Sequence, residues 1–299
     1  MILDRRAFLG SAAAVGAAAA APALAKGDVS QEVWAQQGTI TRSGGQMHYA
    51  TLGNPNNPAV VLLPKLGGWI ADWRHVAPYL AERYYVIAID PPGHGGSRFP
   101  GPAPYVQTLT ESAAAVMATL TMLGIERFSV FGNSLGGCIG VALAAFWPEA
   151  VHKLGLVSTA LYSKNSLADI KAADLSPRPG NYDADWNPLP RTLDRTAATF
   201  GMTQEINDEL NQSRALAGKW VRASERGVMM GGVADNLSRI KAPTLLLYGS
   251  TGSYLKYQEV ARERMQNPRI VTVSAKGSFV HQEQPVETAR VLLDFLAEK

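Results

Sequence analysis

Residues 130–137 read Val-Phe-Gly-Asn-Ser-Leu-Gly-Gly and stand where an apolar run ends and a run of small residues begins. A Gly-x-Ser-x-Gly pattern at such a junction predicts a tight turn from a strand into a helix, because the residues that flank the serine must be small. Gly132 and Gly136 meet this requirement. The turn would hold the Ser134 hydroxyl above the sheet at a helix N-terminus, with the backbone N–H of Leu135 directed at the place where negative charge would develop.

Strand-like and helix-like patterns alternate on both sides of this turn. Apolar runs of strand length lie at 59–63, 85–89, 128–131, 154–157, 244–248 and 269–273. Helical patterns lie at 72–83, 108–123, 135–147, 254–265 and 286–296, and a β-hairpin is expected over 38–52. This alternation predicts a mostly parallel sheet with helices on both faces.

The alternation stops between about residues 160 and 239. Residues 176–190 are rich in Pro, Asp and Asn, and the helical stretches after them contain no buried-strand run. We therefore expect a helical cap inserted between two strands. Its large apolar residues would either line a pocket or pack the cap onto the main domain, and they are Trp186, Met202, Trp220, Met229 and Met230.

The N-terminal residues 1–25 have the pattern of a targeting segment. A twin-arginine stretch at 4–10, Asp-Arg-Arg-Ala-Phe-Leu-Gly, is followed by an alanine-rich run that ends in Ala-Leu-Ala at 23–25. This predicts a Tat signal peptide, with a mature chain that starts near Lys26 and works in the periplasm or outside the cell. The run is short and weakly apolar, so no stable membrane span is expected after cleavage. An uncleaved N-terminal anchor is the alternative.

The composition suits one large α/β domain with a full core. Of the 299 residues, 46% are hydrophobic and 18% are charged, and the net charge of +3 comes with no dense basic run that would indicate nucleic acid. The only cysteine, Cys138, cannot form an intramolecular disulfide, and its small neighbours favour a buried packing role. No metal-ligand spacing and no dinucleotide fingerprint stand out, so neither a metal nor a cofactor is expected. The partner that we expect is a small molecule.

Three motifs together resemble the α/β-hydrolase superfamily over residues 38–297. They are the serine turn at 132–136, the sequence Asp-Pro-Pro-Gly-His-Gly-Gly-Ser at 90–97, and Glu-Gln-Pro at 283–285. The resemblance implies the α/β-hydrolase fold over residues 26–299, with a central sheet, helices on both faces and a cap insertion. It also implies a catalytic triad, in which Ser134 is the nucleophile, a histidine is the base and an acid orients that base.

Two positions of this triad depart from the family pattern. The acid usually follows the fold's strand at 244–248 in a pattern like Gly-x-x-Asp, and here Gly252 stands at its place. The histidine usually forms a Gly-His pair five residues before the glutamate of Glu-x-Pro, and here Ser278 stands at its place. A serine is a poor nucleophile without a base, so the resemblance implies a degenerate triad.

The loop that would form the oxyanion hole also departs from the pattern. The family's usual His-Gly-x-Gly reads Pro-Lys-Leu-Gly at 64–67. The backbone N–H groups of Leu66 and Leu135 are the expected donors, since a backbone donor does not depend on its side chain. Lys65 replaces a glycine, however, and a change of local conformation there would misform the hole.

Two residues are candidates for a substitute base. His281 lies three residues after Ser278, and Lys65 lies in the oxyanion loop. A desolvated lysine can activate a serine, whereas a solvated loop lysine and a packing histidine are the alternatives. The four other histidines are expected in a hairpin strand, a helix, a structural turn and an exposed segment, and they are His48, His75, His94 and His152.

Three functions are open at this point. The first is an exported, hydrolase-like protein that acts on a small apolar ester-like molecule through Ser134. The second is a catalytically silent relative that binds a small molecule, because Gly252 and Ser278 would enlarge the pocket. The third is a lyase, isomerase or cyclase that uses the same pocket without an acyl-enzyme.

Overall fold

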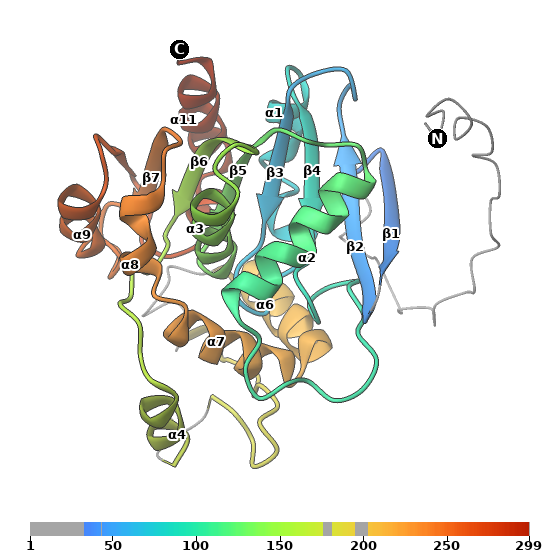
Figure 1. The fold of residues 1–299 in the computed structure, drawn as a ribbon, viewed down its shortest axis with the longest axis vertical. Coiled ribbons are helices and arrows are strands. Elements are labelled where there is room, and N and C mark those ends of the chain that lie inside the picture. Colours follow the sequence, from blue (N-terminus) through green and yellow to red (C-terminus); the bar gives the residue numbers. More distant parts are fainter. Residues whose placement is uncertain (1–32, 43, 176–180, 195–202, 299) are drawn as a thin grey trace, which may run out of the picture.

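The computed structural model describes residues 33–42, 44–175, 181–194 and 203–298 (Figure 1). Residues 1–25, the start near Lys26 and Met202 lie outside the described residues. The described part of the chain forms one eight-stranded sheet in the order β1-β2-β4-β3-β5-β6-β7-β8. Only the pairs β1/β2 and β2/β4 are antiparallel. The strands are β1 (Gln36–Arg42), β2 (Gly45–Leu52), β3 (Ala59–Leu63), β4 (Tyr85–Ile89), β5 (Phe128–Asn133), β6 (Val151–Val157), β7 (Thr244–Gly249) and β8 (Arg269–Val273).

Helices cover both faces of the sheet (Figure 1). One face carries α2 (Leu109–Met122), α3 (Leu135–Phe146) and α9 (Tyr257–Arg264). The other face carries the 3-10 turn η1 (Ile70–Trp73), α1 (Ala77–Ala81), α10 (Val280–Glu283) and α11 (Pro285–Ala297). This is the expected fold class, the α/β-hydrolase fold with a mostly parallel sheet.

The strand sequences explain why both faces are covered. All five residues of β3 are buried, and successive side chains of a strand point to opposite faces. Val61 and Leu63 therefore pack against α2 and α3, while Val60 and Leu62 pack against the helices behind the sheet. Truncating such a fully buried Leu to Ala typically costs about 2–5 kcal/mol.

A helical insertion lies between β6 and β7, as the change of pattern predicted. It contains α4 (Leu167–Leu175), α6 (Gln204–Ala217), α7 (Trp220–Met230), α8 (Val233–Asn236) and η2 (Leu237–Arg239). In Figure 1 α4, α6 and α7 lie beyond one end of the sheet. A buried ion pair ties α6 to the main domain, because Arg74 Nη1 donates to Glu209 Oε2 at 2.8 Å.

The prediction of one helix over 72–83 was wrong. The structure has η1 followed by a turn and then by the short α1, whose first turn contains Pro78. Proline lacks a backbone N–H and favours the first turn of a helix, so it marks a new start. The expected helix at 254–265 also begins later, at Tyr257, which leaves Tyr254 in the preceding turn.

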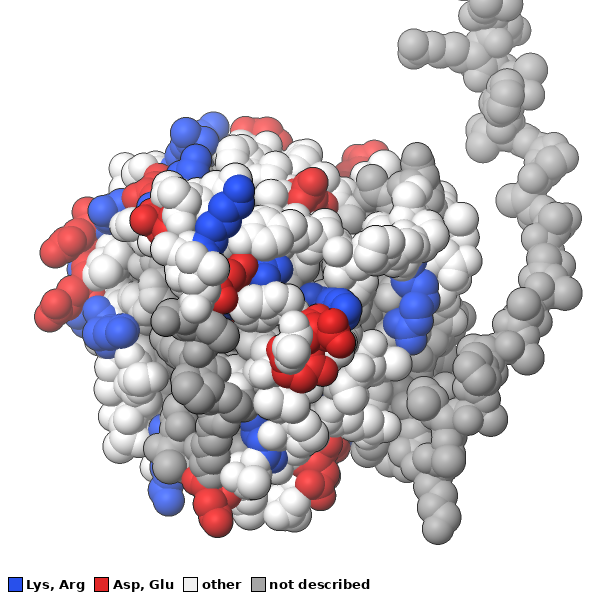
Figure 2. Space-filling model, turned by 90° about the horizontal axis from the view of Figure 1, so that it is seen from below, with Lys and Arg blue, Asp and Glu red and all other residues white. Residues whose placement is uncertain are grey.

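Figure 2 views the molecule from the cap side. Lys and Arg side chains are interspersed there with Asp and Glu among many uncharged residues. The visible described surface therefore gathers no large field of one sign that would steer a charged ligand. Within the described ranges, no helix combines the length and the apolar character needed to span a bilayer.

Candidate active site

Ser134 has the strained backbone that the Gly-x-Ser-x-Gly turn predicts. Its φ of 51° and ψ of −108° lie outside the conformations that suit a non-glycine residue, which typically costs about 1–3 kcal/mol. The turn is so tight that a Cβ on Gly132 would collide with the backbone of Gly136, and one on Gly136 would collide with Leu63. The backbone N–H of Ser134 donates to the Val157 carbonyl at 3.1 Å, which fixes the turn to the next strand.

Leu66 and Leu135 supply free backbone donors beside Ser134. Both residues line a cavity of about 300 Å³ together with Ser134. Within the described residues neither of these backbone N–H groups has a hydrogen-bond partner. Lys65 does not adopt a positive φ, and the left-handed position of the loop falls on Gly67, with φ 73°. The lysine therefore fits this loop without backbone strain.

The cavity above Ser134 is walled by the main domain and by the cap. The helix α7 contributes Glu225, Val228 and Met229 to it. The remaining walls come from the serine turn and from three loops, and their residues are Leu66, Ser134, Leu135, Cys138, Ala160, Tyr162, Asn165 and Tyr254. Burial raises the pKa of the Cys138 thiol to about 12, so this side chain is an inert neutral wall.

Only Met229 of the apolar cap candidates lines this cavity in the described part of the chain. Trp220 packs instead on Phe99, with ring centroids 5.6 Å apart. Trp186 lines a different hollow, and Met230 lies in neither. Packing of the cap thus accounts for most of these residues.

Gly252 lies against Gly277, the residue before Ser278, and Ser278 contacts the serine turn. A Cβ on Gly252 would stand 3.6 Å from the Gly277 carbonyl oxygen, which is ordinary contact. The carbonyl of Ser278 accepts a hydrogen bond of 2.7 Å from Nδ2 of Asn133, the residue before Ser134. The structure therefore brings together the three positions that the family pattern assigns to a triad.

Tyr254 is a site residue that the sequence analysis missed. Burial raises the pKa of its phenol, and hydrogen bonding with Ser278 and, less strongly, with Ser134 lowers the pKa by a smaller amount. The phenol consequently keeps its proton at neutral pH and faces two serine hydroxyls. The one available signal was its position, two residues after Gly252 on the loop that usually carries the acid.

Lys65 is held away from Ser134 by a buried ion pair. Its Nζ lies 2.6 Å from Asp72 Oδ1 and donates to Gln282 Oε1 at 3.0 Å. The same ammonium stands 4.9 Å from the centre of the Phe279 ring. Burial raises the pKa of Asp72, and the charge of Lys65 partly offsets this. A lysine with these partners is not positioned to take a proton from Ser134.

His281 is likewise not brought to the serine. Its fully buried ring lies against Trp73 behind the sheet, with centroids 4.3 Å apart. Burial, and then the nearby Lys65 charge, hold the pKa of His281 well below its ordinary value. Neither ring nitrogen has a partner among the described residues. His281 is therefore a neutral packing side chain rather than a base at this site.

The other histidines have structural surroundings. His48 Nδ1 lies 2.7 Å from Asp90 Oδ2 in the turn at 90–97, and burial lowers the pKa of His94 there. His75 lies in the turn between η1 and α1 instead of a helix, and His152 is exposed in β6. Across the described ranges, no three His, Cys, Asp or Glu side chains gather closely enough to hold a metal ion.

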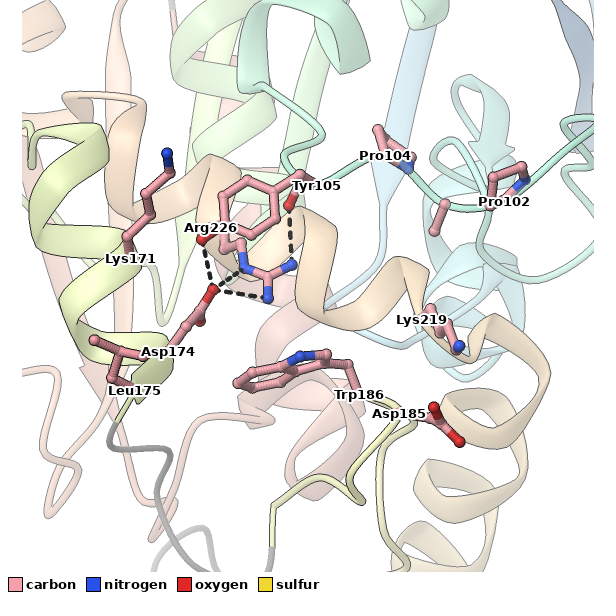
Figure 3. Close-up of a pocket in the computed structure, with 11 residues that line it drawn as sticks. Pro102, Pro104, Tyr105, Lys171, Asp174, Leu175, Asp185, Trp186, Lys219 and Arg226 are labelled. Atoms are coloured by element: carbon pink, nitrogen blue, oxygen red, sulfur yellow. Dashed lines mark hydrogen bonds and ion pairs between the residues drawn. The ribbon is translucent and has the colours of Figure 1, made fainter.

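A second, larger hollow of about 770 Å³ lies between α4, α7 and the loop at 102–105 (Figure 3). Asp174 lines this hollow and receives hydrogen bonds from Tyr105 at 2.6 Å and from Arg226 Nε at 3.0 Å. Arg222 pairs with the same carboxylate. The Trp186 ring lies against both arginines, 5.1 and 5.0 Å from their guanidinium carbons. These contacts bond the charged groups of Asp174 and the two arginines to one another.

Comparison with known proteins agrees with the α/β-hydrolase fold. A family model described as the alpha/beta hydrolase fold matches residues 58–188. The 3-oxoadipate enol-lactonase 2 of Acinetobacter baylyi is 29% identical over 259 residues, which cover 85% of this chain and 87% of that protein. The 2-hydroxy-6-oxo-6-phenylhexa-2,4-dienoate hydrolase of Comamonas testosteroni is 26% identical over 279 residues, which cover 85% and 92%.

Solved structures share the fold. The enol-lactonase from Burkholderia xenovorans LB400 superimposes with a TM-score of 0.68 at 21% identity, covering 87% of this chain and 100% of that one. A hydrolase from Pseudomonas aeruginosa gives a TM-score of 0.72 at 23% identity, covering 88% and 99%. At this level of identity the likeness concerns the fold alone.

Proposed function

We propose, from the α/β-hydrolase fold of this chain, that it is a hydrolase-like protein that acts on a small, largely apolar ester-like molecule over Ser134. One observation carries the proposal: a strained serine and two unpaired backbone N–H groups, those of Leu66 and Leu135, line one cavity of about 300 Å³. A carbonyl carbon placed over the Ser134 hydroxyl would direct its oxygen at these donors. A cavity of this size suits a small molecule.

The relatives support the choice of a carbonyl compound. Their names describe an enol-lactonase and a hydrolase of an oxo-dienoate. We extend to this chain only the chemical class, a small molecule with an ester-like or related carbonyl group.

We further propose that the triad is degenerate, with Gly252 at the acid position and Ser278 at the base position. The adjacency of these residues beside the serine turn supports this assignment. Serine hydrolases that lose a triad member typically retain about 10³–10⁴-fold catalysis over water. Turnover through Ser134 is accordingly expected to be slow.

Export by the Tat route is part of the proposal and is supported by the twin-arginine pattern at residues 4–10. Cell fractionation of the parent and of Arg5→Lys/Arg6→Lys tests it. We expect the parent in the periplasm or medium, with an N-terminus near Lys26 by mass spectrometry, and retention of the double variant inside the cell. Equal distribution of the two proteins would contradict export by this signal.

Hydrolysis of a short-chain p-nitrophenyl ester tests the activity. The proteins compared are the parent, Ser134→Ala, and the restoring variant Gly252→Asp/Ser278→His. Position 252 has room for a side chain, but Tyr254 faces Ser278, so the restoring variant is also made with Tyr254→Ala. We expect slow, Ser134-dependent turnover in the parent and a rise of about 100-fold or more on restoration, as a positioned base typically provides. A parent whose rate equals that of Ser134→Ala would contradict the proposal.

A silent ligand-binding protein is the second candidate. It is favoured by one observation, that the side chain lining the cavity beside Ser134 on the loop of Gly252 is the neutral phenol of Tyr254, which is not a base. It predicts that a short ester or lactone raises the melting temperature of parent and Ser134→Ala equally, without turnover. Turnover that survives Ser134→Ala would instead indicate a lyase, isomerase or cyclase.

A further inference from the structure

Three hydroxyl groups meet at the point where the fold usually places a histidine and an acid. Ser134 comes from the turn after β5, Tyr254 from the turn before α9, and Ser278 from the loop before α10. The phenol of Tyr254 is the member whose pKa is lowered by interaction with both serines. It also lines the cavity above Ser134, so a bound ligand would contact it.

The phenol is suited to handle a proton in both directions. A protonated phenol has one O–H donor and an oxygen that accepts. A buried site disfavours any step that creates a full charge, because the charged product is poorly solvated. A group that receives one proton while it releases another creates no full charge on itself.

We propose that Tyr254 is a catalytic residue that relays the Ser134 proton to the oxygen that leaves the substrate. The inference rests on the proposed function. In the first half-reaction Ser134 Oγ bonds to the carbonyl carbon, and the bond from that carbon to the leaving oxygen breaks. The Ser134 proton passes to the Tyr254 oxygen, and the Tyr254 proton passes to the leaving oxygen, directly or through the Ser278 hydroxyl.

The second half-reaction restores every group. A water molecule attacks the acyl carbon and gives a proton to Tyr254, while the proton of Tyr254 passes to Ser134 Oγ as the acyl bond breaks. The acid product forms, no electron is transferred, and Tyr254 ends with one proton as it began. Such a relay needs neither the missing histidine nor the missing acid.

The surroundings of the phenol agree with a neutral relay. The titratable groups that face it are Tyr162 after β6, Tyr257 on α9 and Cys138 on α3. Glu225 on α7 lines the same cavity, but Tyr182 and Arg222 both donate to its carboxylate, at 2.6 Å each. Among the described residues, the one carboxylate in the cavity wall is thus already bonded to two donors in the cap.

The experiment measures two rates in the parent, Tyr254→Phe and Ser278→Ala. The first is labelling of Ser134 by a fluorophosphonate, and the second is hydrolysis of two acetates that differ only in the leaving group, p-nitrophenol or a simple alkanol. Tyr257→Phe is the matched control, because it removes a phenol of the neighbouring helix whose ring contacts Tyr162 and does not line the cavity.

We expect Tyr254→Phe to slow labelling by about 100-fold, the lower range for a positioned acid or base. The loss should be larger for the alkyl ester than for the p-nitrophenyl ester, because p-nitrophenolate leaves without receiving a proton. Ser278→Ala should have a smaller effect and Tyr257→Phe almost none. The Ser134-dependent rate should also lack an inflection near the ordinary histidine pKa of about 6.5.

Equal labelling of the parent and Tyr254→Phe would overturn the relay and leave Ser134-dependent hydrolysis standing. Labelling that depends on Tyr254 without any ester turnover would support the relay and contradict the proposed hydrolysis. Absence of both labelling and turnover in the folded parent would contradict both. A loss that is the same for the two esters would assign Tyr254 a structural role and overturn the relay.

Discussion

The two hollows of this molecule differ in what their polar groups are bonded to. In the larger one, Asp174 takes hydrogen bonds from Tyr105 and Arg226 and pairs with Arg222, so the charges of Asp174 and the two arginines satisfy one another. In the smaller one, the backbone N–H groups of Leu66 and Leu135 lack partners. Size would favour the first hollow as a ligand site, whereas free donors beside a strained serine favour the second. We interpret the cluster of Asp174, Arg222, Arg226 and Tyr105 in the first hollow as a clasp that holds the cap against the main domain.

The largest expected effect tests the clasp. Asp174→Ala would leave Arg222 and Arg226 mostly buried beside one another, without the carboxylate that pairs them. Breaking a buried ion pair in this way typically costs about 3–5 kcal/mol. Urea unfolding should show a lower midpoint for Asp174→Ala than for Asp169→Ala, a matched change at an exposed site of the same helix. Equal midpoints would show that these charges contribute nothing to stability and would reopen the larger hollow as a site.

The clasp also predicts that the free energy of unfolding depends on pH. Burial would raise the pKa of Asp174, but hydrogen bonds from Tyr105, Arg222 and Arg226 outweigh it and hold the pKa below its ordinary value. A carboxyl with a lowered folded pKa contributes stability that is present above its unfolded pKa, about 3.9, and lost as pH falls further. Unfolding followed between pH 5 and 3 should show a steeper loss for the parent than for Asp174→Asn.

The next prediction compares how one substitution in each hollow changes the rate of ester hydrolysis. Ser134→Ala should remove the acyl-enzyme route and lower ester hydrolysis strongly, whereas Trp186→Ala should change it by less than about twofold. The reason is that Ser134 is the proposed nucleophile, while Trp186 lies in the hollow between α4 and α7. Initial rates with a p-nitrophenyl ester give both values. A larger loss in Trp186→Ala than in Ser134→Ala would invert the comparison.

An unpaired polar group need not belong to a binding site. The ring nitrogens of His281 lack partners among the described residues, yet the ring lies behind the sheet. Its folded pKa lies well below its unfolded value of about 6.5, because of burial and the charge of Lys65. The stability that depends on a neutral ring is therefore present above about pH 6.5 and lost as pH falls. His281→Phe keeps a ring against Trp73. When the pH falls from 7.5 to 5, its free energy of unfolding should rise relative to that of the parent by up to about 2 kcal/mol.

Urea midpoints at the two pH values give this difference, and the buried His94 serves as a constant background in both proteins. Ester hydrolysis should be retained in His281→Phe. A variant that loses hydrolysis while it stays folded would show that His281 acts on the site after all.

The smallest effect concerns the strain at the serine turn. Ser134→Gly should raise the free energy of unfolding by about 1 kcal/mol relative to Ser134→Ala, because glycine relieves a strained φ but loses more chain entropy on folding. Both variants lack the hydroxyl, so activity does not enter the comparison. A lower midpoint for Ser134→Gly would show that the turn stores no strain.

The strands and the serine turn could be predicted because each depends on neighbours in sequence. Apolar runs such as 59–63 and 85–89 match β3 and β4 residue for residue. The close approach of Gly132 to Gly136 spans one short turn, so the pattern itself fixes the geometry around Ser134. The turn within 72–83 was missed, although Pro78 at the start of α1 marked it.

The partners of the site residues could not be predicted in the same way. Lys65 pairs with Asp72 nearby but donates to Gln282, which is 217 positions further along the chain. Whether a lysine is a free base or half of an ion pair depends on such distant contacts. Tyr254 was missed because it was assigned to a helix, and a residue in a helix is not expected to face the serine of a different turn.

The contact between Lys65 and Gln282 also determines when the loop of Leu66 can be held in place during synthesis of the chain. The loop that carries Leu66 is held by a residue near the C-terminus, and Asn133 is held by Ser278, 145 positions after it. Contacts between such distant positions form only after the chain between them has been made and ordered. A ribosome-bound chain that stops before β8 would therefore contain every described residue of the cavity wall but would lack the two contacts that hold Lys65 and Asn133.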